Sequence, residues 1–468
     1  MTVNPADSEI YGGLYGTPEM RELFSDANRL GFMLEVEAAL ARVEARLGII
    51  PKAAAAAIVK AAKAGNLPMA RMAKGATLTG QPVAALAKAL GEAAGGTAAA
   101  YVHWGATTQD VADTALVLQL RHALDLIARD LLSLGNALAA QARRHRDLPM
   151  AGRTFLQQAL PVTFGYKCAI WLAPLADHLA RLEQLKRRDL AVQFGGAAGT
   201  LASLGNKGRA VAKALAAELG LALPEAPWHA NRERMAEIAC FLGLVCGSLG
   251  KFAGDVVLLM QTEVAELAEP REAGGGGSST LPQKRNPVQS AHVLAAVRGV
   301  HALVPLMLGA IAGDHERSTG AWQSEALALP QILALTAGAL RHAAAVAKGM
   351  TVDQARMRDN LDLTHGLILS EAVMMALAEK TGRAEAQRLV TRACEAALDR
   401  RRPLAEMLAG EKDIARHLNA KAITRLTDPA RYLGDAPGVV DRVLARWRAA
   451  ETRFKHSRAA TTIIGRNA

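Results

Sequence analysis

The sequence predicts an all-α protein built around a bundle of long helices. Alanine and leucine are abundant among its 468 residues, hydrophobic residues make up 51% and aromatic residues only 4%, so a large core must be aliphatic. In residues 31–48 the apolar side chains recur at helical spacing, as at Met33, Val36 and Leu40. No long stretch alternates apolar and polar residues, which is what a half-buried strand would require.

Four segments predict long helices. The strongest covers residues 230–270, which contain no proline before Pro270 and carry apolar side chains on more than one face in the middle third. Such wide apolar coverage is typical of a helix buried among others or at a subunit interface. The other three segments are residues 110–145, 162–190 and 288–312. We therefore expect an N-terminal helical domain in residues 1–109, a central long-helix bundle in 110–354 and a C-terminal helical domain in 355–468.

The formal net charge of +11 predicts an anionic partner. The lysines and arginines are spread along helices, as in the stretches ARRHRD and LKRRDL. No basic stretch is interleaved with aromatic residues that could stack on bases. We therefore expect no nucleic-acid partner and a small anionic substrate instead.

Three features bear on the compartment. The N-terminus carries Asp7, Glu9 and Glu19 and no apolar run, so we expect no signal peptide. The most apolar segment, residues 300–313, is shorter than the roughly 20 residues that a membrane span needs, so we expect no membrane partner. The four cysteines have neither paired nor metal-ligand spacing, which is typical of a reduced cytoplasmic protein without a metal site.

A glycine-rich stretch, GGGGSSTLPQKRNP, occupies residues 274–287. Taken alone, it could be a flexible linker or a mobile loop that brings a serine to a substrate. Asn286 and Pro287 predict the N-cap and the first position of the next long helix. A linker does not explain why two hydroxyl groups and Lys284 lie between a hinge and a helix start. The positive end of that helix, together with Lys284, would bind an anion.

A second stretch, HWGATTQDVADTA, occupies residues 103–115. Thr107 and Asp110 have the spacing of a capping box that starts a helix. Such a cap would leave Thr108 and Gln109 pointing hydrogen-bond donors outward at the helix N-terminus, where they suit a carboxylate. From these residues alone, Thr107 is equally well explained as a cap and nothing more, and His103 is better explained as a buried structural histidine.

Several stretches together resemble the fumarase/aspartase superfamily. GGSSTLPQKRNP is similar to its signature GSSxMPxKxNP, with Leu281 in place of methionine, and HWGATTQDVADTA and GRTFLQQALPVTFG (residues 152–165) are similar to two further family segments. Other similar stretches are residues 194–205, 227–234, 314–330 and 360–383, so the resemblance spans most of the chain. It is greatest to a lactonising branch that acts on a carboxymuconate. It implies a homotetramer whose sites are each assembled from three subunits, with no metal or organic cofactor.

The resemblance also implies roles for individual residues. It makes Ser278 the acid/base, and it makes His103 a candidate for substrate binding or proton transfer. Lys284 and Asn286 would hold the carboxylate of an enediolate, whose charge needs fixed donors. For Arg153 and Arg317 an ordinary salt bridge explains the residue at least as well as an anion site does. The substrate-binding candidates are Thr107, Thr108, Arg153, Thr154, Gln157, Lys284, Asn286 and His315.

One departure from the family pattern bears on the reaction. Fumarases, argininosuccinate lyases and adenylosuccinate lyases carry RTH where this chain has Arg153-Thr154-Phe155, and a phenylalanine cannot transfer a proton. A leaving amine or hydroxide needs that proton, whereas a leaving carboxylate departs as a stable anion. The departure favours cycloisomerisation, in which the carboxylate of the substrate adds across its own double bond to give a lactone. The alternatives are a C–N lyase acting on a succinyl substrate such as adenylosuccinate, and a catalytically silent family member.

Overall fold

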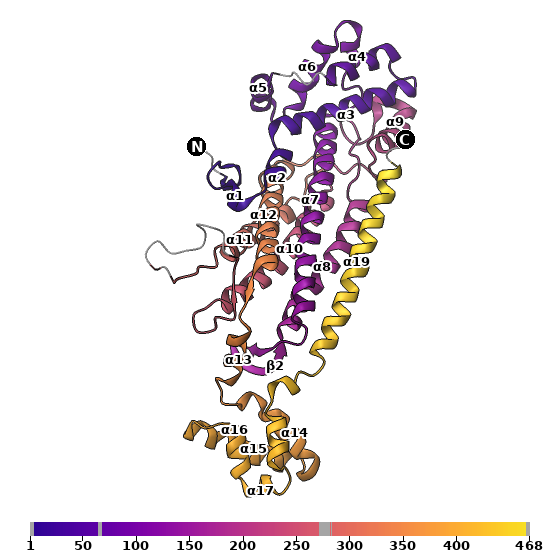
Figure 1. Cartoon of the computed structure of the whole chain (residues 1–468). Coiled ribbons are helices and arrows are strands. Elements are labelled where there is room, and N and C mark those ends of the chain that lie inside the picture. The colour runs from indigo at the N-terminus through magenta and orange to yellow at the C-terminus, as the bar shows by residue number, and fades with distance from the viewer. Residues whose placement is uncertain (1–3, 64–67, 271–280, 282, 465–468) are drawn as a thin grey trace.

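A computed structural model describes residues 4–63, 68–270, 281 and 283–464 of the chain. The molecule is elongated and mostly helical, as predicted (Figure 1). Long helices run side by side along its length, shorter N-terminal helices cover one end, and a small group of C-terminal helices lies at the other end (Figure 1). Ser278, the predicted acid/base, lies outside the described residues.

The described part of the central bundle contains six long helices, among them the four that the sequence predicted. The sequence did not locate α12, whose pattern is interrupted by Pro330, or α19, which is rich in arginine. Although α19 is the last element, it packs along α7 and α8. The bounds are α7 (Thr108–Arg144), α8 (Phe164–Arg188), α10 (Glu233–Leu259), α11 (Val288–Gly309), α12 (Ala321–Gly349) and α19 (Ala436–Ile464).

A close approach between α7 and α19 explains why the C-terminal helix returns to the bundle. The buried Trp447 ring of α19 lies directly over Gly135 of α7, where a Cβ would come within 2.1 Å of a ring carbon. The indole N–H of Trp447 donates to Oδ1 of Asn136 at 2.9 Å, so the ring is buried with its polar group satisfied. A glycine at position 135 is therefore required for α19 to dock.

The N-terminal part is built on α3, which packs across the start of α7. The helix α9 comes from much later in the chain, yet it also packs on α3. Val211 and Leu215 of α9 share a hydrophobic core with Leu40 and Val43 of α3. The bounds of these elements are η1 (Pro5–Asp7), α1 (Gly12–Tyr15), α2 (Pro18–Leu23), α3 (Asp26–Arg46), α4 (Lys52–Lys63), α5 (Met69–Thr79), α6 (Val83–Ala94), η2 (Gly96–Tyr101), η3 (Ala202–Lys207) and α9 (Gly208–Leu219).

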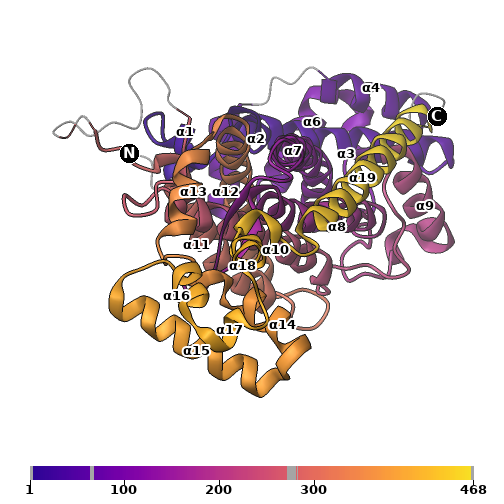
Figure 2. The same ribbon diagram turned by 60° about the horizontal axis from the view of Figure 1, so that its bottom comes forward.

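The helices from α14 to α18 form a small group with its own hydrophobic core, whereas Met357 of α13 packs in the core of the bundle. Figure 2 shows this group projecting from the lower end of the bundle. Leu377, Leu389 and Leu404 are among its buried residues. The bounds are α13 (Gln354–Asp362), η4 (Leu367–Leu369), α14 (Ser370–Thr381), α15 (Arg383–Arg400), α16 (Leu404–Gly410), α17 (Lys412–Ala415), α18 (Ala420–Leu426) and η5 (Pro429–Arg431).

A short antiparallel hairpin joins α7 to α8, although no long alternating stretch in the sequence predicted a sheet. Its strands are β1 (Pro149–Thr154) and β2 (Gln157–Thr163), so the helix expected from residue 162 begins at Phe164 instead. Phe155 and Leu156 form the tip with positive φ angles of 50° and 63°, and Phe155 is 99% exposed. A second, two-residue pair joins β3 (Leu267–Ala268) to β4 (Thr351–Val352).

A buried ion-pair network joins three bundle helices. Arg232, just before α10, has a fully buried guanidinium that donates to Asp113 of α7 at 2.7 and 3.0 Å. It also donates to Glu325 of α12 at 2.7 and 2.5 Å and lies over the Trp228 ring. Burial raises the pKa of Glu325, although its bonds to Arg232 oppose the shift. Two carboxylates thus depend on one cation inside the bundle.

We predict that Arg232→Ala destabilises the protein by about 3–5 kcal/mol, since it leaves Asp113 and Glu325 buried without a cation. The matched control is Arg442→Ala, which breaks an exposed pair with Asp435 and should leave the stability almost unchanged, because solvent screens that pair. Urea-unfolding midpoints of both variants measure the difference. Equal midpoints for the two variants would contradict the structural role of Arg232.

Candidate active site

The N-terminus of α7 is capped as the sequence predicted. The backbone N–H of Thr107 donates to Oδ2 of Asp110 at 3.0 Å, completing a capping box. The prediction for Gln109 was wrong: its side chain is buried, and its Nε2 donates to the carbonyl oxygen of His229 at 2.9 Å. Gln109 faces inward because the buried segment around His229 packs against this side of α7. Thr107 and Thr108 remain partly exposed, so a ligand can reach them.

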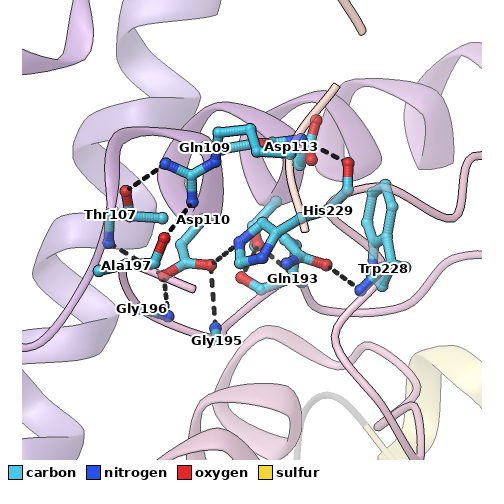
Figure 3. A network of polar contacts seen from close by, with 12 residues as sticks. Thr107, Gln109, Asp110, Asp113, Gln193, Gly195, Gly196, Ala197, Trp228 and His229 are labelled. Carbon is cyan, nitrogen blue, oxygen red and sulfur yellow. Dashed lines mark hydrogen bonds and ion pairs between the residues drawn. The ribbon is translucent and has the colours of Figure 1, made fainter. Parts of the chain in front are cut away.

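The buried carboxylate of Asp110 joins this helix end to two other stretches (Figure 3). Its Oδ1 accepts hydrogen bonds from the Gly195 N–H at 2.9 Å and from Nε2 of His229 at 2.7 Å. Its Oδ2 accepts from the Gly196 N–H at 2.9 Å in addition to Thr107. Each oxygen therefore has two donors, which is what a buried carboxylate needs. Three stretches that separately resemble the family meet at this one side chain.

Arg317 brings a fourth stretch to the same place. Its Nη1 donates to Oγ1 of Thr107 at 3.2 Å, and its Nη2 donates to the carbonyl oxygen of Ala197 at 3.0 Å. The guanidinium therefore adds positive charge at the positive end of α7, beside the partly exposed threonines. His315, two residues earlier, is exposed and has a φ of 43°. In the described residues Arg317 makes no ion pair, so the salt-bridge alternative that the sequence left open finds no partner there.

His103 lies just before this helix end and pairs with a buried carboxylate. Its Nδ1 is 2.6 Å from Oε1 of Glu37 on α3, and the Glu37 side chain is 1% exposed. Burial by itself would lower the pKa of His103, but the hydrogen bond to Glu37 and the charges of Glu37 and Asp110 outweigh it. The net result is a raised pKa. The raised pKa favours the protonated form of His103, close to the partly exposed start of α7.

The structure places a second group of predicted residues at the far end of the bundle. Arg153 donates both Nη groups to the buried carboxylate of Glu266, at 2.9 and 2.7 Å, so the salt-bridge alternative describes this residue. Thr154 and Gln157 flank the exposed tip of the hairpin. The 37 residues of α7, at about 1.5 Å each, separate this hairpin from Thr107 by roughly 55 Å. One chain does not bring the two groups together.

The start of α11 differs from the prediction. The helix begins at Val288 with Pro287 in the N-cap position, one residue later than expected. The Glu269 carboxylate already accepts the N–H groups of Gln289 and Ser290, at 3.0 and 2.7 Å. These two N–H groups are thus not free for a substrate, which removes part of the predicted anion site. Lys284 is exposed and Asn286 is partly exposed, so both side chains remain available.

Comparison with known proteins identifies the family. A family model described as "Lyase" matches residues 14–301, and one described as "Adenylosuccinate lyase C-terminus" matches residues 366–443. The chain belongs to the fumarase/aspartase lyase superfamily. This confirms the resemblance that the motifs indicated.

Members of the superfamily that resemble this chain differ in the reactions for which they are named. The 3-carboxy-cis,cis-muconate cycloisomerase of Pseudomonas aeruginosa is 49% identical, over 94% of this chain and 97% of that protein. The 3-carboxy-cis,cis-muconate lactonizing enzyme of Pseudomonas putida has a crystal structure with a TM-score of 0.90 and 46% identity, over 95% of this chain and all of that one. Trans-aconitate decarboxylase 1 of Mycosarcoma maydis is 43% identical, over 92% of this chain and 88% of that protein.

Several buried polar groups of this lyase were not predicted as parts of the site. Glu37 and Glu44 could have been found, because they lie at helical spacing within the apolar stripe that includes Met33 and Leu40. No local signal marks Glu269, because its partners Gln289 and Ser290 lie 20 and 21 residues later in the chain. Among the described residues, no three His, Cys, Asp or Glu side chains gather as metal ligands. The expectation of a site without a metal or cofactor stays a prediction.

Glu44 is buried two helical turns beyond Glu37, and neither of its carboxyl oxygens has a hydrogen-bond partner in the described structure. Burial, and to a smaller extent the charge of Glu37, raises the pKa of Glu44 to about 8. Because the folded-state pKa is raised, the stability that Glu44 contributes is fully present below its unfolded-state pKa and is lost as the pH rises toward 8.

We predict that Glu44→Gln raises the melting temperature, and that the gain is larger at pH 8.5 than at pH 5.5. At pH 8.5 the corresponding gain in the free energy of unfolding should be on the order of a few kcal/mol, because each unit of pKa shift corresponds to about 1.4 kcal/mol. Thermal unfolding at the two pH values measures it. Glu35→Gln is the control, since Glu35 is exposed on the same helix. A gain from Glu44→Gln that is the same at both pH values would contradict the assignment.

Proposed function

We propose that this lyase-superfamily enzyme is a 3-carboxy-cis,cis-muconate cycloisomerase. The observation that carries the proposal is Phe155, which occupies the hairpin tip between Thr154 and Gln157 and is 99% exposed. The position offers no acid for a leaving amine or hydroxide, and a cycloisomerase needs none there. The high identity to cycloisomerases along almost their whole length supports the same reaction.

In the proposed reaction, a carboxylate of the substrate adds to the carbon–carbon double bond of the same molecule. The new C–O bond leaves an enediolate, whose charge lies on the oxygens of a neighbouring carboxylate. Ser278 then delivers a proton to the enediolate carbon, giving 4-carboxymuconolactone. The ionised substrate takes up one proton in this step, and Ser278 regains its proton from solvent, so no other reactant is consumed. Lys284 and Asn286 would stabilise the enediolate oxygens. This reaction belongs to protocatechuate breakdown.

The remaining substrate carboxylates need further donors. Thr107, Thr108 and Arg317 gather at the positive end of α7, and nearby the hydrogen bond to Glu37 helps to raise the pKa of His103. Thr154 and Gln157 would act from the hairpin of a different subunit, and His315 from the segment that carries Arg317. The net charge of +11 suits a tricarboxylate.

Self-association would bring the two ends of the bundle together. The helices α10 and α11 are long and apolar enough to span a membrane by length and composition, yet much of each is not buried within the chain. Leu244, Leu306, Leu308 and Leu327 are among the exposed apolar side chains of the bundle. Exposed apolar surface of this kind marks an interaction site. We propose that other copies of the chain cover it in a cytoplasmic homotetramer whose sites each draw on three subunits.

A second candidate is a C–N lyase of the same superfamily that acts on adenylosuccinate or a similar succinyl substrate. The match of residues 366–443 to the C-terminal part of adenylosuccinate lyases favours it. Phe155 disfavours it, because a leaving amine needs a proton that a phenylalanine cannot supply. Loss of one general acid costs about 10²–10⁴-fold in rate, so such an enzyme would be slow.

We predict that the purified enzyme turns over 3-carboxy-cis,cis-muconate with a kcat/KM at least about 100-fold higher than for adenylosuccinate or trans-aconitate, a ratio within the range that differential transition-state binding provides. The loss of the conjugated diene absorbance follows the cycloisomerase reaction, and fumarate or carbon dioxide release follows the others. Faster turnover of adenylosuccinate than of the muconate would establish the second candidate instead.

We also predict that Ser278→Ala lowers kcat by at least about 100-fold, because it removes the hydroxyl that exchanges the proton. Ser279→Ala is the neighbouring control and should retain most of the activity. Analytical ultracentrifugation should give the same oligomeric state for both variants. Near-normal turnover by Ser278→Ala would remove this serine from the mechanism.

A further inference from the structure

A buried carboxylate in the apolar stripe of α3 is used to hold one histidine. Glu37 is 1% exposed, and its Oε1 lies 2.6 Å from Nδ1 of His103. Removing a carboxylate from water is costly unless a charged or strongly donating partner compensates. The partner comes from a loop 66 residues later in the chain. An apolar side chain at position 37 would pack in the same core, so the pair points to a role other than packing.

The backbone around His103 adopts a conformation that few residues share. His103 has a φ of 60° and is followed by Gly105 with a φ of 69°. A Cβ on Gly105 would approach the Leu204 side chain to 2.7 Å, so the backbone is tightly packed there. The backbone sets where the His103 ring starts, and the hydrogen bond between Nδ1 and Glu37 sets its orientation. The His103 side chain is still 20% exposed.

The other ring nitrogen of His103 is open to a ligand. Within the described part of the chain, Nε2 of His103 makes no hydrogen bond, and it is not one of the atoms buried without a partner. Four residues later, Thr107 is the N-cap of α7, and its Oγ1 accepts a hydrogen bond from the Arg317 guanidinium. An imidazole whose pKa is raised, a guanidinium and a helix N-terminus together would suit an anion.

The charges around His103 favour its protonated form. Glu37 faces it from α3 and Asp110 from α7, and both carboxylates raise its pKa against the opposing effect of burial. Glu44, the next acidic residue along the buried face of α3, is mostly protonated at neutral pH, since burial raises its pKa to about 8. Glu37 is therefore the acidic group of α3 that acts on the ring at neutral pH.

We propose that Glu37 is a positioning residue that holds His103 by Nδ1 and so presents its Nε2–H to a carboxylate of the substrate. Both ring nitrogens donate in this arrangement, which requires the imidazolium form. Glu37 itself does not touch the substrate. The substrate part of this inference rests on the proposed function, whereas the hold of Glu37 on His103 does not.

The first test measures His103 without any ligand. Deuterium exchange at Cε1 of each histidine, followed by mass spectrometry across pH, gives the titration midpoint of each ring in the intact protein. In Glu37→Gln the midpoint of His103 should fall by at least about one pH unit, because the negative charge is lost while the side-chain shape is kept. Glu37→Asp, which keeps the charge, should give an intermediate midpoint.

Two matched controls accompany this measurement. Glu44→Gln removes the second buried carboxyl group of α3 and should leave the His103 midpoint at its wild-type value. His178 lies on α8 and its pKa is lowered to about 4 by burial and by the charge of Arg181, so its midpoint should not change in any variant. An unchanged His103 midpoint in folded Glu37→Gln would overturn the proposal.

The second test is kinetic and uses 3-carboxy-cis,cis-muconate. Glu37→Gln should raise KM by at least about tenfold, equivalent to about 1.4 kcal/mol, with a smaller change in kcat. The pH above which KM rises should move downward with the His103 midpoint. A shifted midpoint with wild-type KM at every pH would show that His103 does not bind substrate and would overturn that part. If the wild-type enzyme turns over adenylosuccinate instead, the proposed function fails while the titration result still decides the role of Glu37.

Discussion

The hydrogen bonds to Asp110 are the constraint on which the geometry at the start of α7 depends. One buried carboxylate accepts the N–H of Thr107, two glycine N–H groups and the imidazole of His229, so three stretches far apart in sequence share one anchor. Two of its donors are glycine N–H groups, and Gly196 has a φ of 71°, so this loop conformation is open to few other residues. Partly exposed groups that could contact a ligand, such as Thr107, are positioned by a group that no ligand touches.

The candidate site residues form two groups at opposite ends of the bundle, so a site that contains both groups would need more than one chain. His103 and Thr107 lie at one end of α7, and the hairpin with Thr154 and Gln157 follows its other end. A side chain reaches a few ångströms, whereas a helix of this length spans tens. Residues that the family resemblance assigns to one site can meet only if another chain brings its hairpin to the start of α7. The exposed leucines of the bundle are apolar surface that such a contact would bury.

The sequence predicted the helical fold and the capped start of α7 because both depend on local spacing: apolar periodicity for the long helices, and four residues for the capping box. It did not predict the β1–β2 hairpin, whose strands are short and whose tip adopts positive φ angles at Phe155 and Leu156. It also missed the pairs Glu37–His103, Arg153–Glu266 and Glu269 with α11, because each joins residues distant in sequence. The sequence wrongly predicted that the Gln109 side chain points outward. Which side of α7 is buried there depends on the segment around His229, which is distant in sequence.

The docking of α9 on α3 has a consequence for how the chain is made. Val211 and Leu215 complete a core that begins with Leu40 and Val43, so the N-terminal helices cannot bury that face until Leu219 has left the ribosome. Contacts between residues so far apart in sequence form slowly, since loop closure must precede them. A fragment that stops at the end of η2 would expose this apolar face to water and would tend to aggregate. The N-terminal helices therefore depend on α9 to cover their apolar face.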